Sequence, residues 1–227
     1  MSNTLELYAL PNLQGDSHSL QADSPDLSTV GFLKRAQSLK VIGDPWIVFT
    51  GTKYQGEFFN YKEGTYNSIP SFANKISSVR VVPGGFFPHK ITVYEQVNYG
   101  GKMVPLEKSA DSLKPYQLDN MASSHKTHSG AWILYEEEYY RGKRMITVAG
   151  DEVPNYVPLD WNDIVGSVKH ITSSEQPVSC TYSQHLLPAY QNESARAAQF
   201  PAGDPPSADP AMILIPQLQS EEIPCTH

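Results

Sequence analysis

The chain has few cysteines, and none of them lies in its first three quarters, where a disulfide bond could otherwise stabilise the fold. Its 227 residues include only Cys180 and Cys225, both in the last quarter. A disulfide framework is therefore excluded for the rest of the chain, whose stability must come from packing. Hydrophobic residues make up 40% of the sequence, a composition typical of globular proteins rather than of disordered or fibrous ones.

Targeting and membrane signals are also missing. The first residues contain no basic region followed by an apolar run, which argues against a secretory signal. The longest late apolar run, Met212–Ile215, is far shorter than the ~20 residues that span a bilayer. We therefore expect a cytoplasmic protein. The sequon at Asn192 keeps one alternative open, secretion by a non-classical route.

Clustered positive charge is absent as well. The formal net charge is −7, of which residues 173–227 contribute −5, from six acidic residues and Arg196. The remainder is near neutral, at −2. Because nucleic-acid-binding proteins need a basic surface, we expect no nucleic-acid partner.

Catalytic motifs are not found. The sequence lacks a G-x-S-x-G nucleophile turn, an H-E-x-x-H zinc helix and a G-x-x-x-x-G-K-[ST] phosphate loop. His125 and His128 have no third ligand nearby in the sequence, so we interpret them as solvated loop residues. We interpret Glu136–Glu138 as a solvated turn, because nothing indicates burial that would separate their pKa values. The sequence predicts that this protein is not an enzyme.

A short pattern does occur four times along the chain. An aromatic residue precedes a glycine by seven positions at Tyr8/Gly15, Phe49/Gly56, Tyr94/Gly101 and Tyr135/Gly142. The copies form two pairs, because Tyr94 follows Tyr8, and Tyr135 follows Phe49, by 86 residues. An internal repeat of this kind sets the architecture of the chain.

The repeated pattern indicates strands rather than helices. Pro11 would break a helix in the first copy, and Gly100 and Gly101 adjoin in the third. Short β-branched or aromatic runs separated by turn residues predict an all-β sandwich. These runs are Leu39–Ile42, Trp46–Phe49, Val79–Val82, Ile91–Tyr94, Trp132–Tyr135 and Val168–Ile171.

Each copy predicts a folded hairpin. The glycine supplies a positive φ, and the aromatic ring is expected to lie across the hairpin where a side chain on that glycine would clash. About thirty residues after each aromatic comes a serine whose hydroxyl could bond the exposed backbone of the hairpin. These serines are Ser38, Ser78, Ser124 and Ser167.

An aromatic residue, six residues, a glycine and then a serine, in paired copies, resembles the βγ-crystallin Greek key superfamily over about residues 3–172. The resemblance implies two β-sandwich domains of two Greek keys each: domain 1 at 3–83, a linker at 84–89 and domain 2 at 90–172. Residues 173–227 contain eight prolines and are predicted to be a largely disordered tail. In character the chain most resembles the non-lens epidermis differentiation-specific proteins.

Members of this superfamily that bind calcium carry Asn/Asp, Asn/Asp, two free residues, Ser/Thr and Ser in each repeat of a pair. The resemblance implies that two such loops supply two sites between them. Each site takes an acidic or amide side chain and a backbone carbonyl from one loop, and the fifth-position hydroxyl from the other. These are the oxygen ligands that calcium prefers. In domain 2 they would come from Asp119, Asn120, Met121, Ser123, Asn162, Asp163 and Ile164.

The four loops fit this pattern unequally. Asp119–Ser124 fits at every position, whereas Asn162–Ser167 has Gly166 in place of the fifth-position hydroxyl residue. We therefore expect one stronger and one weakened calcium site in domain 2. In domain 1, Leu33–Ser38 and Ala73–Ser78 lack first-position oxygen ligands, and no useful site is expected. The alternative is that the acids and amides serve only left-handed or Asx-turn geometry.

The predicted function is a non-catalytic βγ-crystallin-type structural protein that binds calcium ions through domain 2. A protein partner or self-association is left open. The alternative is a subunit or truncated relative of a crystallin/aerolysin-like pore-forming, membrane-active complex, because some relatives carry such a module and work with a trefoil-factor partner. Residues 173–227 show no long alternating strands of the kind a β-pore needs, so no membrane partner is expected unless this alternative holds.

Overall fold

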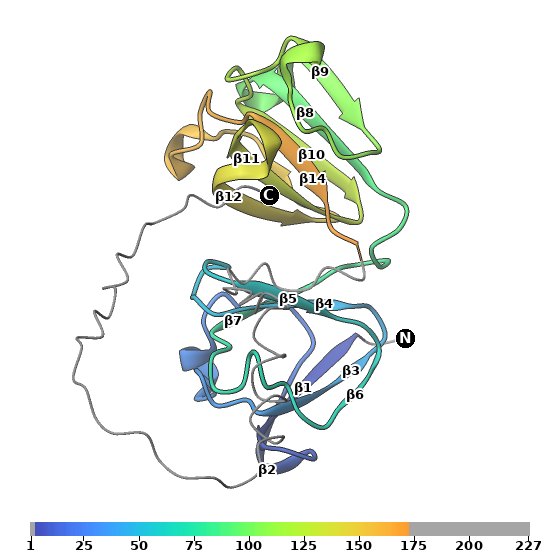
Figure 1. Cartoon of the computed structure of the whole chain (residues 1–227), viewed down its shortest axis with the longest axis vertical. Helices are drawn as coiled ribbons and strands as arrows, with labels where there is room; N and C mark the ends of the chain where they lie inside the picture. The colour runs from blue at the N-terminus through green and yellow to red at the C-terminus, as the bar shows by residue number, and fades with distance from the viewer. Residues whose placement is uncertain (1–2, 173–227) are drawn as a thin grey trace, which may run out of the picture. The chain divides into compact units, whose positions relative to one another are not determined.

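The structure is a computed structural model that describes residues 3–172 (Figure 1). The predictions for residues 173–227 lie outside the described residues. The described part is built of β-strands and short 3-10 turns, with no α-helix in it. The predicted all-β class is confirmed, and no α-helix crosses the aromatic-to-glycine patterns at Phe49–Gly56 or Tyr135–Gly142.

The first two repeats form two antiparallel sheets, with strand orders β2-β1-β3-β6 and β5-β4-β7. Strand β6 belongs to the second repeat but pairs with β3 of the first, which is the exchange that makes a Greek key sandwich. The strands are β1 Thr4–Leu10, β2 Gln14–Leu20, β3 Ser38–Ile42, β4 Trp46–Phe49, β5 Phe58–Tyr61, β6 Gly64–Tyr66 and β7 Ser78–Val81, with the 3-10 turn η1 Leu27–Val30.

The last two repeats form the sheets β13-β10-β8-β9 and β12-β11-β14, and here β13 pairs with β10 of the preceding repeat. The strands are β8 Lys90–Gln96, β9 Gly100–Leu106, β10 Ser124–Ser129, β11 Ala131–Glu137, β12 Arg141–Val148, β13 Glu152–Val153 and β14 Ser167–His170. The 3-10 turns are η2 Val97–Tyr99, η3 Lys114–Tyr116, η4 Glu138–Tyr140 and η5 Val157–Leu159.

Each half has its own apolar core between its two sheets. Trp46 and Trp132, which occupy equivalent positions 86 residues apart, are both fully buried, one in each core. A third cluster combines buried residues of both halves, including Ile47, Phe49 and Ile133. Burial of apolar side chains at ~25 cal/mol per Å² is the main stabilising contribution in such a sandwich.

The predicted serine contacts are confirmed in all four hairpins. Each hydroxyl donates to a hairpin carbonyl and accepts from a hairpin N–H, so two exposed backbone groups are satisfied at once. The donor contacts are Ser38 Oγ to Leu10 O (2.6 Å), Ser78 Oγ to Gly51 O (2.7 Å), Ser124 Oγ to Gln96 O (2.6 Å) and Ser167 Oγ to Glu137 O (2.6 Å). The N–H donors are those of Leu13, Tyr54, Tyr99 and Tyr140.

The expected clash at the hairpin glycines involves a different neighbour. A Cβ on Gly142, whose φ is +78°, would meet Glu136 Cβ at 3.0 Å rather than the ring of Tyr135. That ring instead packs on Tyr140, with ring centroids 5.7 Å apart. The hairpin folds back one residue beyond the aromatic, so the glycine approaches the next side chain and the aromatic covers the bend.

The interpretation of His125 and His128 as solvated loop residues is wrong. Both lie on β10, where His125 is fully buried and His128 is exposed. The His125 ring is hydrogen-bonded to the Tyr156 hydroxyl (2.7 Å) and to Thr147 Oγ1 (3.0 Å). Burial lowers the pKa of His125 to about 4, so the ring is neutral at pH 7.

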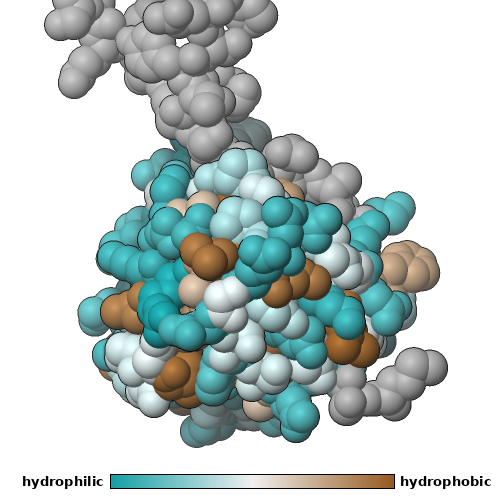
Figure 2. Space-filling view, turned by 90° about the horizontal axis from the view of Figure 1, so that it is seen from below, coloured by the Kyte–Doolittle hydropathy of each residue, from teal (hydrophilic) through white to brown (hydrophobic). Residues whose placement is uncertain are grey.

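The face of the molecule shown in Figure 2 has no continuous apolar patch. Figure 2 shows one face on which hydrophobic side chains form separate patches among hydrophilic ones. Isolated exposed hydrophobic residues are normal on a folded protein. In residues 3–172 there is no helix with the length and hydrophobicity that crossing a bilayer requires.

Candidate metal centre

Two loops meet in the second half of the chain, Asp119–Ser124 before β10 and Asn162–Ser167 before β14. The Asp163 N–H donates to Ala122 O (3.1 Å), and the Asn120 N–H donates to Val165 O (3.3 Å). These two bonds are related by the repeat, because each loop gives its second-position N–H to the other loop. The predicted loops therefore lie side by side, and Figure 1 shows the strands they lead into, β10 and β14.

The second position of every loop has a left-handed backbone. Its φ is 54° at Lys34, 57° at Asn74, 52° at Asn120 and 58° at Asp163. Asn and Asp tolerate this conformation better than other residues with a side chain. The turn interpretation therefore accounts for the residue types of Asn120 and Asp163. Left-handed geometry does not account for Asp119, Asn162 or Ser123, which are not among the positive-φ residues.

Side-chain oxygens of both loops converge at Asp163. The Ser123 hydroxyl donates to Asp163 Oδ1 (3.2 Å), and Asn162 Nδ2 donates to Asp163 Oδ2 (2.6 Å). Ser123 is buried and Asp163 is exposed, so the arrangement is open on one side. Ile164, the proposed carbonyl donor of this loop, is half-buried beside them.

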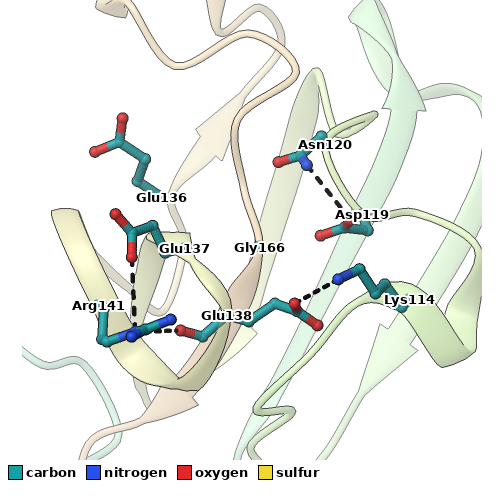
Figure 3. A pocket seen from close by; sticks show the side chains of 8 residues that line it. All are labelled: Lys114, Asp119, Asn120, Glu136, Glu137, Glu138, Arg141 and Gly166. Carbon is teal, nitrogen blue, oxygen red and sulfur yellow. Dashed lines mark hydrogen bonds and ion pairs between the residues drawn. The ribbon is translucent and has the colours of Figure 1, made fainter. Parts of the chain in front are cut away.

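The other end of the loop pair, at Asp119, opens into a cavity of about 270 Å³. Figure 3 shows its lining residues: Lys114, Asp119, Asn120, Glu136, Glu137, Glu138, Arg141 and Gly166. Asn120 Nδ2 donates to Asp119 Oδ2 (3.4 Å), whereas Met121 is exposed. Oxygen ligands thus gather at this end too, but two cationic side chains lie among them.

The cations in this cavity already have carboxylate partners. Lys114 Nζ pairs with Glu138 Oε2, and Arg141 Nε lies 3.6 Å from Glu137 Oε2. The hydrogen bond to Glu138 raises the pKa of Lys114, and the bonds from Lys114 and Ser112 lower the pKa of Glu138. Both groups are therefore charged at pH 7.

At the fifth position of the Asn162–Ser167 loop, the neighbouring backbone leaves no room for a side chain on Gly166. A Cβ on this residue would meet the Glu137 carbonyl carbon at 2.7 Å and the Glu138 nitrogen at 2.8 Å. The sequence shows that the hydroxyl is missing, but it cannot show this close approach, which depends on a hairpin some thirty residues earlier. By the cross-supply that the family resemblance implies, the Asp119 end loses its hydroxyl and the Asp163 end keeps Ser123.

The first half of the chain repeats the same backbone with different side chains. Lys34 N donates to Ile76 O (2.8 Å), and Asn74 N donates to Ala36 O (2.8 Å), as in the second half. The Ser77 hydroxyl donates to Thr50 O (2.7 Å) instead of to the partner loop. The first two positions of these loops are Leu33 and Lys34 in one and Ala73 and Asn74 in the other, so only Asn74 offers a side-chain oxygen where the pattern requires an acid or amide. Arg35 and Lys75 add positive charge at the next positions.

Within residues 3–172, no three His, Cys, Asp or Glu side chains cluster closely enough to hold a metal ion. A cation at either end would therefore depend on hydroxyl, amide and backbone oxygens as well as carboxylates. This donor set suits calcium, which accepts all of these oxygen types, better than zinc, which prefers nitrogen and sulfur.

Comparison with known proteins gives consistent matches. The beta/gamma crystallin family model matches residues 4–82 and 90–171. An epidermal differentiation-specific protein of Cynops pyrrhogaster is 33% identical over 179 residues, 79% of this chain and 53% of that protein. This chain therefore spans about half the length of that relative. Gamma-crystallin M3 of Cyprinus carpio is 32% identical over 168 residues, 72% of this chain and 94% of that protein.

Among solved structures, a beta gamma crystallin from Ciona intestinalis has 32% sequence identity and a TM-score of 0.34. The match covers 36% of this chain and 99% of that chain.

Proposed function

Because the chain belongs to the beta/gamma crystallin family, we propose that it is a non-catalytic structural protein that binds one calcium ion through its second domain. Asn162, Asp163, the Ile164 carbonyl and Ser123 would hold the ion. A second ion would bind weakly or not at all between Asp119, Asn120 and the Met121 carbonyl.

The contact between Ser123 and Asp163 carries this proposal. Their side chains come from different repeats, and the 3.2 Å hydrogen bond joins the two ligand types that the calcium pattern requires. Asn162 adds an amide beside the same carboxylate. Calcium takes six to eight oxygen ligands, so water would complete the set on the open side.

Calcium binding would act on stability. A ligand that binds only the folded state stabilises it by RT ln(1 + [L]/Kd), about 2.7 kcal/mol when the ligand is at 100 times its Kd. For a structural protein without disulfides in its described domains, this gain would adjust resistance to unfolding according to the calcium concentration.

The test is thermal unfolding of the full chain with and without millimolar calcium. We expect calcium to raise the Tm of the unmodified chain and to leave the Tm of Asp163→Gly unchanged. Glycine accepts the left-handed backbone at this position, so the variant removes the carboxylate without straining the turn. Asn74→Gly is the matched control, because it makes the same change in domain 1 and should keep the full calcium response.

Two outcomes would reject the proposed site. The first is an unmodified chain whose Tm does not respond to calcium. The second is an Asp163→Gly variant that keeps the full response. The membrane-active alternative stays a prediction, and release of dye from liposomes by this chain alone would favour it. The cytoplasmic localisation and the protein partner also stay predictions.

A further inference from the structure

The two ends of the loop pair in domain 2 differ in charge. The Asp119 end contains Lys114 beside Glu138, in the cavity of Figure 3. Two matching backbone hydrogen bonds show which residues of the Asp163 end correspond to those of the Asp119 end. At the Asp163 end Asn98 N donates to Pro154 O, and at the Asp119 end Tyr139 N donates to Asp111 O, both at 2.7 Å.

By this equivalence, Val157 corresponds to Lys114 and Val97 corresponds to Glu138. Each of η3 and η5 has proline at its second position and is followed by a left-handed residue. Lys114 and Val157 are the first residues of these two turns, and both side chains are exposed. The positions of the Lys114–Glu138 ion pair at the Asp119 end are thus occupied by two valines at the Asp163 end.

Lys114 is held at the cavity by more than one contact. Its Nζ pairs with Glu138 Oε2, and its backbone N–H donates to Ser112 Oγ (3.1 Å). The Ser112 hydroxyl also donates to the Glu138 carboxylate. Glu138 is therefore fixed from two sides, and the negative charge of Asp119 lies near enough to act on the ammonium group as well.

We propose that Lys114 is a tethered cation that takes the place of calcium at the Asp119 end and so limits domain 2 to one ion. This inference rests on the proposed function. An incoming calcium ion would have to approach a fixed positive charge of like sign, and the carboxylate of Glu138, which lines the same cavity, is already paired with Lys114. The Asp163 end has valines at these positions and presents no such charge.

The experiment measures how many calcium ions bind per full-length chain by isothermal titration calorimetry. Lys114→Gln removes the charge from an exposed side chain and keeps it polar, with a chain one atom shorter. Lys126→Gln is the matched control. Lys126 lies on β10, outside the two loops, and its Nζ pairs with Glu152 of β13 at 3.1 Å. We expect one ion for the unmodified chain, two for Lys114→Gln and one for Lys126→Gln.

A double variant locates the second ion. Adding Asp119→Ala to Lys114→Gln should return the count to one, while adding Asp163→Gly should leave only the new, weaker site. Circular dichroism of each variant checks that the fold is kept.

The outcomes separate the inference from the proposed function. One ion in both the unmodified chain and Lys114→Gln would overturn the inference and leave the proposed function standing. No ion in the unmodified chain but one in Lys114→Gln would support the inference and reject the Asp163 site. Two ions in the unmodified chain, or none in either protein, would overturn the inference.

Discussion

The two halves of the chain have the same backbone but different side chains where their loops meet. Both loop pairs exchange second-position N–H bonds, and all four second residues are left-handed. The first pair presents basic side chains, whereas the second pair presents the carboxylates of Asp119 and Asp163 with their amide neighbours. The hairpin serines stabilise both halves alike. The loop side chains are therefore free to differ, and ion chemistry can be present in one half without changing the fold of the other.

The largest expected difference between the halves is their response to acid. Leu39 and His125 follow equivalent serines, and both are fully buried. The pKa of His125 is about 4 in the folded state, below the usual value of about 6.5. The unfolded chain therefore binds more protons between these values, and stability falls as the pH drops from about 6.5 to about 4.

The His125 effect can be isolated by substitution. A shift of this size corresponds to a loss of the order of 3 kcal/mol in the free energy of unfolding across that window. His125→Leu introduces the residue that domain 1 has at the equivalent position, Leu39. In this variant the free energy of unfolding, measured by urea unfolding between pH 4.5 and 7, should depend less on pH. His128→Gln changes an exposed histidine on the same strand and is the control. An unchanged slope in His125→Leu would rule out this role.

The fifth positions of the two domain 2 loops provide the next comparison. Gly166→Ser restores the hydroxyl of the calcium pattern but forces a Cβ against the Glu137 and Glu138 backbone. We expect a loss of about 1–3 kcal/mol in the free energy of unfolding, as for other overpacked sites, and no gain in calcium binding.

Ser123→Gly makes the opposite change in the sister loop. It should weaken calcium binding, because it removes the hydroxyl at the Asp163 end. Urea unfolding of both variants measures the free energy of unfolding, and calorimetric titration measures their calcium affinity. A stable Gly166→Ser that binds calcium more tightly would contradict the steric explanation.

The smallest expected effect concerns backbone strain in domain 1. Lys34 has a left-handed backbone at a position where its sister loop has Asn74. Lys34→Asn should raise the free energy of unfolding by up to about 1 kcal/mol, because Asn tolerates this conformation better. The exchange Asn74→Lys should lower it by a similar amount, as measured by urea unfolding. Changes of the same sign in both variants would be inconsistent with this explanation.

Local patterns in the sequence were sufficient for the class of fold and for the hairpins. The aromatic, glycine and serine spacings are short-range signals, and the serine bonds follow from them. The role of His125 could not be predicted, because its burial depends on Thr147 and Tyr156, which other strands and turns bring to it. Lys114 was missed for the same reason, since Glu138 reaches it only after the two repeats pack together.

An amide NMR titration of the full chain with calcium separates the two halves residue by residue. We predict chemical-shift changes centred on residues 121–123 and 162–164, with residues 33–38 and 73–78 unaffected. Equal changes in the domain 1 loops, or no change in the loop pair of domain 2, would contradict a calcium site built by Ser123 and Asp163.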